Sequence, residues 1–239
     1  MKKLLPGFIY KFLNEFRRDY IGESMRTFSG EGEDITLRRI FQHLNTGFYV
    51  DVGACHPRIS SNTHYFYKRG WKGLNIDANP LSIKKYNKLR KRDINVNYGV
   101  SNSNDTLDFY LFEEPGINTF SREVYEDKIK FPGVKLIEKM PVKTAPLAEI
   151  LDKNLPEGQV INFMDVDVEG LDFEVLQSNN WDKYIPEILL VEELSRGKDL
   201  DELPIYQFLR KRGYRMIAKT YSTFIFLHRD VTRYKDFIN

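Results

Sequence analysis

Short apolar runs alternate along the chain with segments that have helical spacing. Four runs rich in apolar and β-branched residues predict buried strands, at 47–53, 71–77, 94–100 and 160–167. Helical periodicity predicts helices at 35–44, 62–69, 81–92 and 171–176. Pro80 stands at the start of the third of these, where proline is favoured. Strands that alternate with helices across short connections are typical of an α/β fold with a parallel, doubly wound sheet.

The end of the chain departs from that alternation. After a strand at 187–191 and a helix at 205–211, two further strands are predicted at 214–219 and 223–227. Only residues 220–222 separate them. A connection this short predicts an antiparallel hairpin.

The middle of the chain is less regular. Residues 106–112 alternate apolar and polar side chains and predict an exposed strand. The charged segment 125–140 contains Pro132-Gly133 and predicts a loop or lid over a site. The basic residues between Lys84 and Arg92 predict a solvated helix face.

Composition narrows the class of protein. The chain has 239 residues, 41% of them hydrophobic, and 36 Lys and Arg against 34 Asp and Glu leave a net charge of +2. This near balance excludes a strongly basic nucleic-acid binder. The single cysteine, Cys55, excludes an intrachain disulfide and a cysteine-rich metal site. No run approaches the roughly 20 apolar residues of a transmembrane helix, so we expect a cytoplasmic protein.

The first 27 residues predict a helical extension ahead of a single domain at 28–239. Apolar residues with helical spacing lie between basic residues on both sides, at Phe8, Ile9, Phe12, Leu13 and Phe16. We expect this helix to pack on its own domain or on a second copy of the chain, as in a homo-oligomer, rather than on a membrane surface.

Acidic residues follow four of the predicted strands at their carboxyl ends. They are Asp51, Asp77, the group Asp165, Asp167 and Glu169, and the pair Glu192 and Glu193. One acid at a strand end often caps a helix. Acids at four strand ends of an open α/β sheet predict a ligand site along that edge.

The spacing of the first two acids indicates a nucleoside ligand. Asp77 lies 24 residues beyond Gly53, where a carboxylate can accept hydrogen bonds from both hydroxyls of a ribose. The first turn, at 52–57, has no Gly-x-Gly-x-x-Gly pattern for a pyrophosphate. A nucleoside without phosphates therefore fits better than a dinucleotide.

Five segments follow one another along the chain: FSGEGED at 28–34, FYVDVGA at 48–54, SNT at 61–63, GWKGLNIDANP at 70–80 and MDVDVEG at 164–170. Together they resemble the FkbM family of S-adenosylmethionine-dependent methyltransferases. The resemblance implies the class I methyltransferase fold, a Rossmann-like and mainly parallel seven-stranded sheet with helices on both faces and an antiparallel last strand. It also implies methyl transfer to a hydroxyl of a sugar or glycan precursor.

The resemblance also implies the cofactor site. Asp51, Gly53 and Ala54 would line the methionine part of the cofactor, Asp77 would hold the ribose, and Ser101 would lie beside the adenine.

Three residues before the first predicted strand and one after it would lie near the cofactor or close over it. They are Ser29, Glu33, Asp34 and Asn62. Two positions depart from the family pattern. Gly30 stands where relatives often have glutamine, and Asp165 stands where they often have lysine or serine.

Methyl transfer from a sulfonium is an in-line displacement, so the protein must orient the acceptor hydroxyl and take up its proton. The candidate bases are Glu169, His56 and His64, of which His64 fits a structural, hydrogen-bonded role better. Metal activation is the alternative route. The pattern Asp167-Val168-Glu169, with Glu192 and Glu193 after the next strand, resembles magnesium-dependent sugar O-methyltransferases, where acids in these places bind the metal and one acts as base. The resemblance implies Asp167, Glu192 and Glu193 as the metal ligands.

Two other functions fit parts of the pattern. Asp165-Val166-Asp167 would serve as the metal-nucleotide motif of a glycosyltransferase, and the sheet alone would suit a non-catalytic nucleoside-binding module. The ribose acid and the first turn precede that motif in methyltransferase order, which favours the methyltransferase. Rings that would stack on a sugar acceptor are Tyr65, Phe66, Tyr67, Phe109, Tyr110, Phe112, Phe120 and Tyr125.

Overall fold

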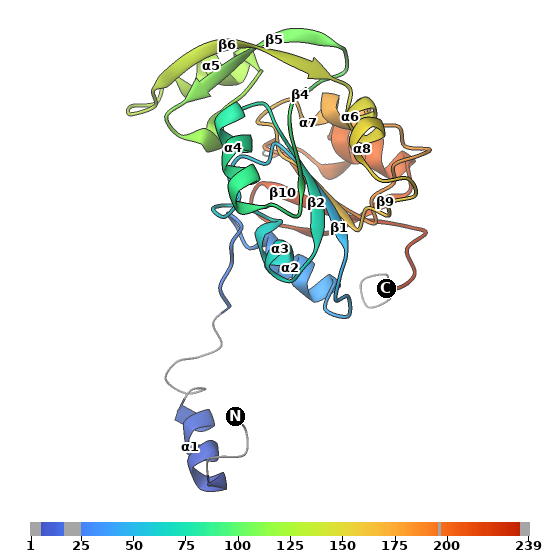
Figure 1. Ribbon diagram of the computed structural model, residues 1–239. Helices are drawn as coiled ribbons and strands as arrows, with labels where there is room; N and C mark the ends of the chain where they lie inside the picture. Colours follow the sequence, from blue (N-terminus) through green and yellow to red (C-terminus); the bar gives the residue numbers. More distant parts are fainter. Residues whose placement is uncertain (1–5, 17–24, 196, 235–239) are drawn as a thin grey trace.

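The predicted strands form one seven-stranded sheet in the computed structural model, which describes residues 6–16, 25–195 and 197–234 (Figure 1). The strands are β1 (Phe48–Val52), β2 (Lys72–Asp77), β3 (Ile94–Asn97), β7 (Phe163–Val166), β8 (Ile188–Glu192), β9 (Tyr214–Lys219) and β10 (Thr223–His228). Their order is β3-β2-β1-β7-β8-β10-β9. β10 pairs antiparallel with both β8 and β9, so it alone runs opposite to the other six strands of this sheet. The predicted α/β fold and its antiparallel last strand are confirmed.

The strand order reverses beside β1. The chain moves outward from β1 to β2 and β3, and then returns to place β7 on the other side of β1. In doubly wound sheets such a reversal leaves a crevice at the carboxyl ends of the two central strands. The acids that follow β1 and β7 therefore border one space.

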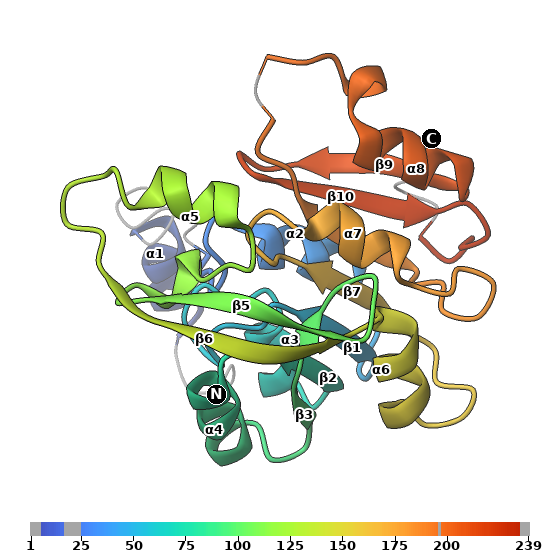
Figure 2. The same cartoon turned by 90° about the horizontal axis from the view of Figure 1, so that it is seen from above.

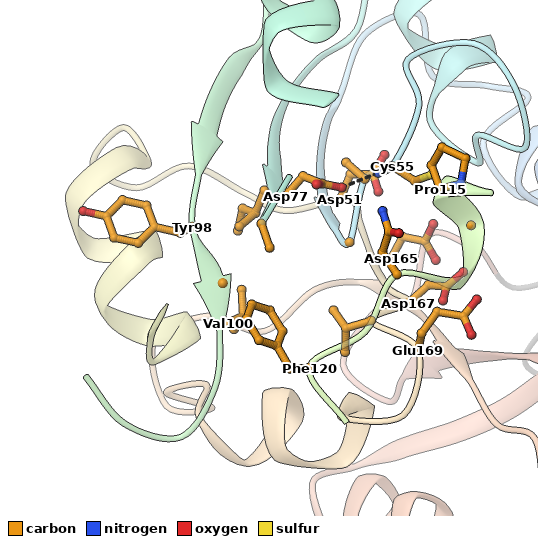
Figure 3. A pocket seen from close by; sticks show the side chains of 18 of the residues that line it. Asp51, Cys55, Asp77, Tyr98, Val100, Pro115, Phe120, Asp165, Asp167 and Glu169 are labelled. Atoms are coloured by element: carbon orange, nitrogen blue, oxygen red, sulfur yellow. Dashed lines mark hydrogen bonds between the residues drawn. The ribbon is translucent and has the colours of Figure 1, made fainter. Parts of the chain in front are cut away.

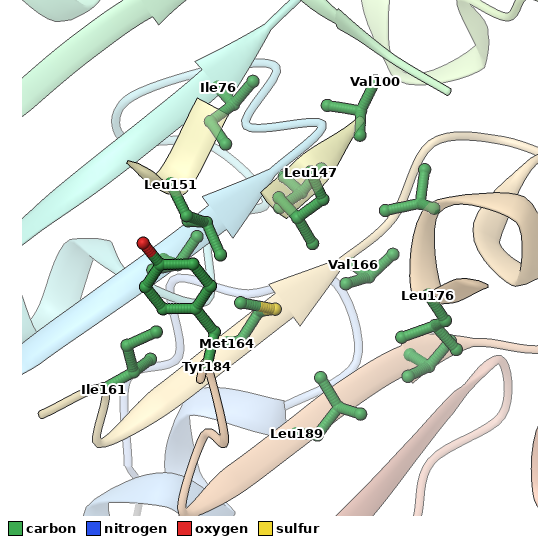
Figure 4. Packing of buried hydrophobic residues seen from close by; sticks show 14 of the residues in the cluster. Ile76, Val100, Leu147, Leu151, Ile161, Met164, Val166, Leu176, Tyr184 and Leu189 are labelled. Atoms are coloured by element: carbon green, nitrogen blue, oxygen red, sulfur yellow. The ribbon is translucent and has the colours of Figure 1, made fainter. Parts of the chain in front are cut away.

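Helices cover both faces of the sheet, so strands such as β1 are buried along their whole length. On one face, α6 (Leu147–Asn154), α7 (Asp172–Gln177) and α8 (Pro204–Lys211) pack on alternate strand residues such as Val50, Met164 and Leu189 (Figure 4). On the other face, α2 (Glu33–Ile40) and α3 (His64–Lys68) pack on the intervening residues, such as Tyr49 and Phe163.

The helix α4 (Pro80–Leu89) follows β2 directly. Pro80 occupies its first turn, and the side chain of Asn79 accepts a hydrogen bond from the Leu81 amide at 2.9 Å. This local chemistry starts the helix immediately after Asp77, so the carboxylate stays at the strand end.

A second, three-stranded sheet crosses the carboxyl edge of the first one, with α5 (Arg122–Lys128) beside it (Figures 1 and 2). It contains β4 (Gly99–Val100), β5 (Asp105–Phe112) and β6 (Leu136–Ala145), and β5 and β6 form an antiparallel hairpin. Short 3-10 turns lie at Pro115–Ile117 and Leu200–Glu202.

Three expectations for this region were wrong. The strand predicted at 94–100 is split, because β4 leaves the central sheet and pairs with β6. The strand β5 is not exposed throughout, since its last four residues are buried. The segment predicted as a loop or lid at 125–140 contains most of α5 and the first half of β6.

Within the predicted N-terminal extension, residues Gly7–Phe16 form the helix α1. None of its residues is buried, and Figure 1 shows it standing away from the two sheets. The expected packing of this helix on its own domain was therefore wrong, whereas packing on a second copy of the chain stays a prediction. The remaining parts of that extension at 1–5 and 17–24 lie outside the described residues. Among the helices that the structure describes, none is long and apolar enough to cross a membrane.

Candidate active site

A cavity of about 280 Å³ lies between the carboxyl ends of β1, β2 and β7 and the second sheet. Figure 3 shows Asp165, Asp167 and Glu169 following one another along one side of it, with Val100 and Phe120 across from them. The predicted residues that line it are Asp51, Gly53, Ala54, Asn62, Asp77, Asp165, Asp167 and Glu169. The fold thus brings most of the strand-end acids to one place.

Strand periodicity explains why the acids share one side. Successive side chains of a strand point to opposite faces. Because Val50, Val52, Met164 and Val166 face the core beneath α6 and α7, the residues Asp51 and Asp165 must face the other side. The same alternation places Asp77 after Ile76 on β2 and Glu192 after Val191 on β8.

Asp77 ties the turn after β1 to the start of α4. Its two carboxylate oxygens accept backbone hydrogen bonds from Cys55, at 2.6 Å, and from Asn79, at 2.7 Å. Burial nevertheless raises the pKa of Asp77 to about 6. Each oxygen retains lone pairs toward the cavity, so the carboxylate can still accept hydrogen bonds from ribose hydroxyls.

Asp51 and Asp165 are partners across β1 and β7, and both are buried. Asp51 accepts a 2.7 Å hydrogen bond from the Thr63 hydroxyl, and Asp165 accepts one of 2.8 Å from the Asn62 amide. Burial raises the pKa of Asp51 to about 6. Burial, and then the nearby Asp51, raise the pKa of Asp165 well above its usual value. The pair therefore suits a cationic ligand, which would favour the charged carboxylates.

Gly53 allows β1 and β7 to approach at the cavity. Its φ of +84° lies in the left-handed region, and a Cβ at this position would come within 1.7 Å of the Asp167 carbonyl oxygen. Only glycine fits both constraints. The turn that the sequence identified from Gly53 is thus fixed by its contact with the end of β7.

Asp167, Glu169 and Glu192 form an acidic cluster at one end of the cavity. One carboxylate oxygen from each lies within 4.8 Å of the other two. Burial and the charges of Asp167 and Glu169 raise the pKa of Glu192 well above its usual value. The Glu192 Oε2 atom is buried without a hydrogen-bond partner among the described residues. An oxygen-rich group with an unsatisfied acceptor fits a hard divalent cation such as Mg²⁺.

Glu169 is held in place by the turn after β7. Its φ is +54°, unusual for a residue with a side chain, and the next residue is Gly170. The Asp172 carboxylate accepts hydrogen bonds from the Val168 and Gly170 amides at 3.0 and 3.1 Å. The Thr119 hydroxyl, from the segment after β5, donates to the Glu169 carbonyl at 2.7 Å. The backbone of Glu169 is therefore fixed from both sheets.

Two opposing influences act on the pKa of the Glu169 carboxylate. Burial raises its pKa to about 7, while Lys128 of α5, with Nζ at 3.7 Å from Oε2, acts in the opposite direction. A carboxylate with a pKa near neutrality can accept a proton from a substrate and release it again. This pKa makes Glu169 the candidate general base of the cavity.

Two predicted residues lie elsewhere. His56 does not line the cavity, and its Nδ1 accepts hydrogen bonds from the Arg58 and Ile59 amides, both at 3.1 Å. Ser101 is buried behind Val100, and its hydroxyl donates to the Ser103 carbonyl at 2.9 Å. Val100, the neighbour of Ser101, lines the cavity instead.

The upstream residues are part of a packed loop beside the cavity. Asp34 accepts hydrogen bonds from the hydroxyls of Ser29, at 2.8 Å, and Thr27, at 2.6 Å. Glu33 is buried and accepts one of 3.2 Å from Thr220 in the turn between β9 and β10. They do not line the cavity, but they join the start of α2 to the sheet edge.

Glu193, the last of the predicted metal ligands, is outside the acidic cluster. Its Oε1 accepts a 2.8 Å hydrogen bond from the Ser195 amide. Glu169 takes its place beside Asp167 and Glu192. Asp165, the first acid of the proposed glycosyltransferase motif, is likewise not part of the cluster.

Arg90 was missed by the sequence reading, which placed it on a solvated helix face. It is only 1% exposed, so that expectation was wrong at this position. Its guanidinium donates to the Pro57 carbonyl and to the hydroxyls of Tyr49, Ser61 and Thr63, at 2.8 to 3.2 Å. Arg90 thereby holds the loop that forms one wall of the cavity.

The aromatic wall of the cavity is smaller than the sequence suggested. Of the eight rings considered for a sugar acceptor, Phe109 and Phe120 line the cavity, with their ring centroids 4.8 Å apart. Phe66 is in the core, and Tyr110 stacks on Tyr125 at 4.2 Å within the second sheet and α5. Most of these rings therefore stabilise the fold.

Comparison with known proteins identifies the family of the chain. A family model for the methyltransferase FkbM domain matches residues 51–216. No curated protein matches the sequence.

Two solved structures are similar at low identity. A human methyltransferase 10 domain containing protein shares 11% identity, with a TM-score of 0.40, over 95% of this chain and 98% of that chain. A putative O-methyltransferase from Klebsiella pneumoniae also shares 11%, with a TM-score of 0.42, over 95% of this chain and 93% of that one.

The matched segment begins at Asp51 and includes the carboxyl ends of β1, β2 and β7, which border the acid-lined cavity. It spans more than half of the chain. The chain belongs to the methyltransferase FkbM family and is an S-adenosylmethionine-dependent methyltransferase.

Proposed function

We propose that this methyltransferase acts on a hydroxyl of a sugar or glycan precursor and that Glu169 takes up the hydroxyl proton. The observation that carries the proposal is that Asp77 and Glu169 line the same cavity from two strand ends. One carboxylate suits a ribose, and the other has a pKa of about 7. The cavity thus has places for both the cofactor and the reacting hydroxyl.

The cofactor would lie along the carboxyl edge of the sheet. S-adenosylmethionine supplies a methyl group on a positively charged sulfonium, which becomes a neutral thioether after transfer. Asp77 would accept hydrogen bonds from the ribose, while Asp51 and Asp165 would face the cationic part. Val100 offers apolar surface for the adenine.

The positive charge of the cofactor agrees with the electrostatics of the cavity. Asp51, Asp77 and Asp165 all have pKa values raised mainly by burial. A bound cation would stabilise their ionised forms, whereas an anionic ligand would meet the full repulsion. This selectivity supports S-adenosylmethionine over a sugar nucleotide or a dinucleotide in the cavity.

Glu169 would then act on the acceptor. A sugar hydroxyl is a weak nucleophile, and it must lose its proton when its oxygen attacks the methyl carbon of the cofactor. Glu169 would accept this proton, and Lys128 would stabilise the ionised carboxylate between turnovers. Phe109 and Phe120 are the rings at the cavity that could pack on the acceptor.

Metal activation is the second way to deprotonate the acceptor. Asp167, Glu169 and Glu192 would hold Mg²⁺, which would lower the pKa of a bound hydroxyl. The unsatisfied Oε2 of Glu192 supports this route. Here Glu169 would be a ligand, and Glu192 would be ionised rather than protonated.

Two measurements test the proposal. The purified chain would be incubated with S-adenosylmethionine and a panel of sugars, nucleotide sugars and glycans, with mass spectrometry of the products. We expect a mass gain of one CH₂ on an oxygen of a sugar. A methyl group found only on nitrogen or carbon acceptors would contradict the hydroxyl assignment.

The metal route is tested with EDTA and with Glu192→Gln. If Mg²⁺ acts there, EDTA abolishes turnover, added Mg²⁺ restores it, and Glu192→Gln weakens the response to Mg²⁺. The matched control is Glu193→Gln, outside the acidic cluster. Full activity in EDTA would leave Glu169 as the base without metal.

A further inference from the structure

The helix α1 presents large apolar side chains to solvent. Phe8 is 75% exposed, Phe12 is 64% exposed and Leu13 is 48% exposed, and no residue of the helix is buried. Leaving such side chains in water is unfavourable, and contiguous exposed apolar surface usually marks a contact with a partner or a membrane. No part of the fold among the described residues covers this helix.

The exposed apolar residues lie on one side of α1. At 3.6 residues per turn, Phe8 and Phe12 are one turn apart, and Ile9 and Leu13 are one turn apart beside them. Lys11 and Asn14 fall on the opposite side, and Glu15, at the edge of the face beside Phe8, forms an ion pair with Lys11 at 4.0 Å. We call Phe8, Ile9, Phe12 and Leu13 the α1 apolar face.

The charge around this face is positive. Residues 1–18 contain five basic residues, Lys2, Lys3, Lys11, Arg17 and Arg18, and one acidic residue, Glu15, which gives a net charge of +4. The whole chain has a net charge of only +2, so the remainder carries −2. The positive charge is thus concentrated next to the α1 apolar face.

We propose that α1 binds the surface of an anionic lipid bilayer, with the α1 apolar face inserted at the level of the headgroups. A helix with rings on one side, polar residues on the other and basic residues at both ends has the properties of an interfacial membrane helix. The attraction of basic residues to anionic lipids adds to the burial of the rings.

A second copy of the chain is a poorer occupant of this face. A stable interface buries roughly 800 Å² on each partner. A helix of ten residues is only about 15 Å long, which is too short for one side of it to reach that area. Two copies would also bring two segments of the same positive charge together.

The test is sedimentation of the full-length chain with lipid vesicles. Wild-type protein should pellet with phosphatidylcholine vesicles that contain one third phosphatidylglycerol, and much less with phosphatidylcholine alone. High salt should weaken the binding, because it screens the attraction to the anionic lipid. Failure of the wild-type chain to pellet with anionic vesicles would overturn the proposal.

Substitutions in α1 identify the face that binds. In the double variant Phe8→Gln and Phe12→Gln, glutamine preserves the helix propensity of α1. We expect the partition coefficient of this variant onto anionic vesicles to fall at least tenfold. The control Tyr10→Gln changes an exposed ring outside the α1 apolar face and should bind like wild type. Thermal unfolding shows whether each variant remains folded.

Two results for the double variant would overturn the assignment. One is vesicle binding equal to that of wild type. The other is a wild-type dimer in solution, by sedimentation velocity without lipid, that the double variant abolishes. The second result would make the α1 apolar face a contact between copies of the chain.

Discussion

Asp51 and Asp165 stand opposite each other on the neighbouring parallel strands β1 and β7, and both are buried. Both carboxyls have raised pKa values, for which burial is the first cause. These two acids occupy the centre of the sheet edge, where the strand order reverses and the cofactor is expected. Their arrangement favours ligand binding at the expense of stability.

Replacing Asp51 with Asn should therefore stabilise the free protein. The pKa of Asp51 is about 6 in the folded state and 3.8 ordinarily, so the folded protein binds more protons between these values and loses stability as pH rises through them. The gain from Asp51→Asn should be near zero below pH 4 and at most about 3 kcal/mol at pH 7. Urea unfolding at several pH values measures it.

The control for this prediction is Asp182→Asn, an exposed acid far from the cavity. It should change the unfolding free energy by less than about 0.5 kcal/mol at any pH. A gain for Asp51→Asn that is the same at pH 4 and pH 7 would show that its charge is not responsible.

Gly53→Ala should disrupt the site itself. The added Cβ would lie 1.7 Å from the Asp167 carbonyl oxygen, and the residue would have to keep a φ of +84°. We expect a loss of about 3 kcal/mol or more in unfolding free energy, together with loss of cofactor binding.

The matched control is Gly133→Ala, which has a φ of +90° but no atom within 4 Å of the added Cβ. It isolates the backbone contribution, expected at about 1 kcal/mol. Equal losses at the two positions would contradict the close approach of β1 and β7.

Glu169→Gln should affect turnover and not binding. Loss of a general base lowers the rate by roughly 100-fold or more. Wild-type turnover should rise with pH through about 7, because Glu169 acts in its ionised form and its pKa is about 7. The variant should lose this limb of the pH profile and keep its affinity for S-adenosylmethionine.

Steady-state kinetics across pH 5 to 9 measure both effects, with Glu123→Gln on the exposed side of α5 as the control. Unchanged turnover in Glu169→Gln would remove this residue from the mechanism. A large loss of cofactor affinity would instead assign it to binding.

Arg90→Gln should weaken the fold and the cavity wall together. It removes a buried cation that holds Pro57, Ser61 and Thr63, and it leaves Asp93, whose Oδ2 lies 3.7 Å from the Arg90 Nη1, without its charge partner. We expect a loss of about 3–5 kcal/mol in unfolding free energy.

The cofactor affinity of Arg90→Gln, measured at a temperature where the variant is folded, separates the effect on the cavity wall from the effect on stability. We expect at least a tenfold increase in the Kd for S-adenosylmethionine, because the loop at 57–63 loses its anchor. The adjacent exposed cation serves as the control, and Lys91→Gln should change neither quantity. Normal affinity in folded Arg90→Gln would limit this arginine to a structural role.

The sequence predicted the central sheet well because burial on both faces leaves continuous apolar runs. Strands β1, β2 and β7 show such runs, and an acid at each strand end reaches a shared edge wherever strands are parallel. Asp51 and Asp77 could therefore be found from spacing alone.

The second sheet could not be found in this way. Most of β6 is exposed and carries charged side chains, so it has the pattern of a loop. Its pairing with β5 depends on contacts between distant segments, such as Thr106 with Lys143. The sequence therefore could not single out Phe109 and Phe120, which line the cavity, from the other rings considered for the acceptor.

Arg90 shows the same limit for a single residue. Its partners are Tyr49, Pro57, Ser61 and Thr63, which lie 27 to 41 residues before it in the chain. A basic residue at the end of a basic helix has no local feature that distinguishes a buried cation from a solvated one. Only the folded arrangement identifies it.

The most direct test of the account is calorimetric titration of the chain with S-adenosylmethionine and with its product S-adenosylhomocysteine, which lacks the sulfonium charge. We expect both to bind with one site per chain, at least tenfold more weakly in Asp77→Asn. S-adenosylmethionine should also displace more protons near pH 6, because its charge favours ionised Asp51 and Asp165. Binding of a sugar nucleotide or NAD in place of S-adenosylmethionine, or full affinity in Asp77→Asn, would contradict the account.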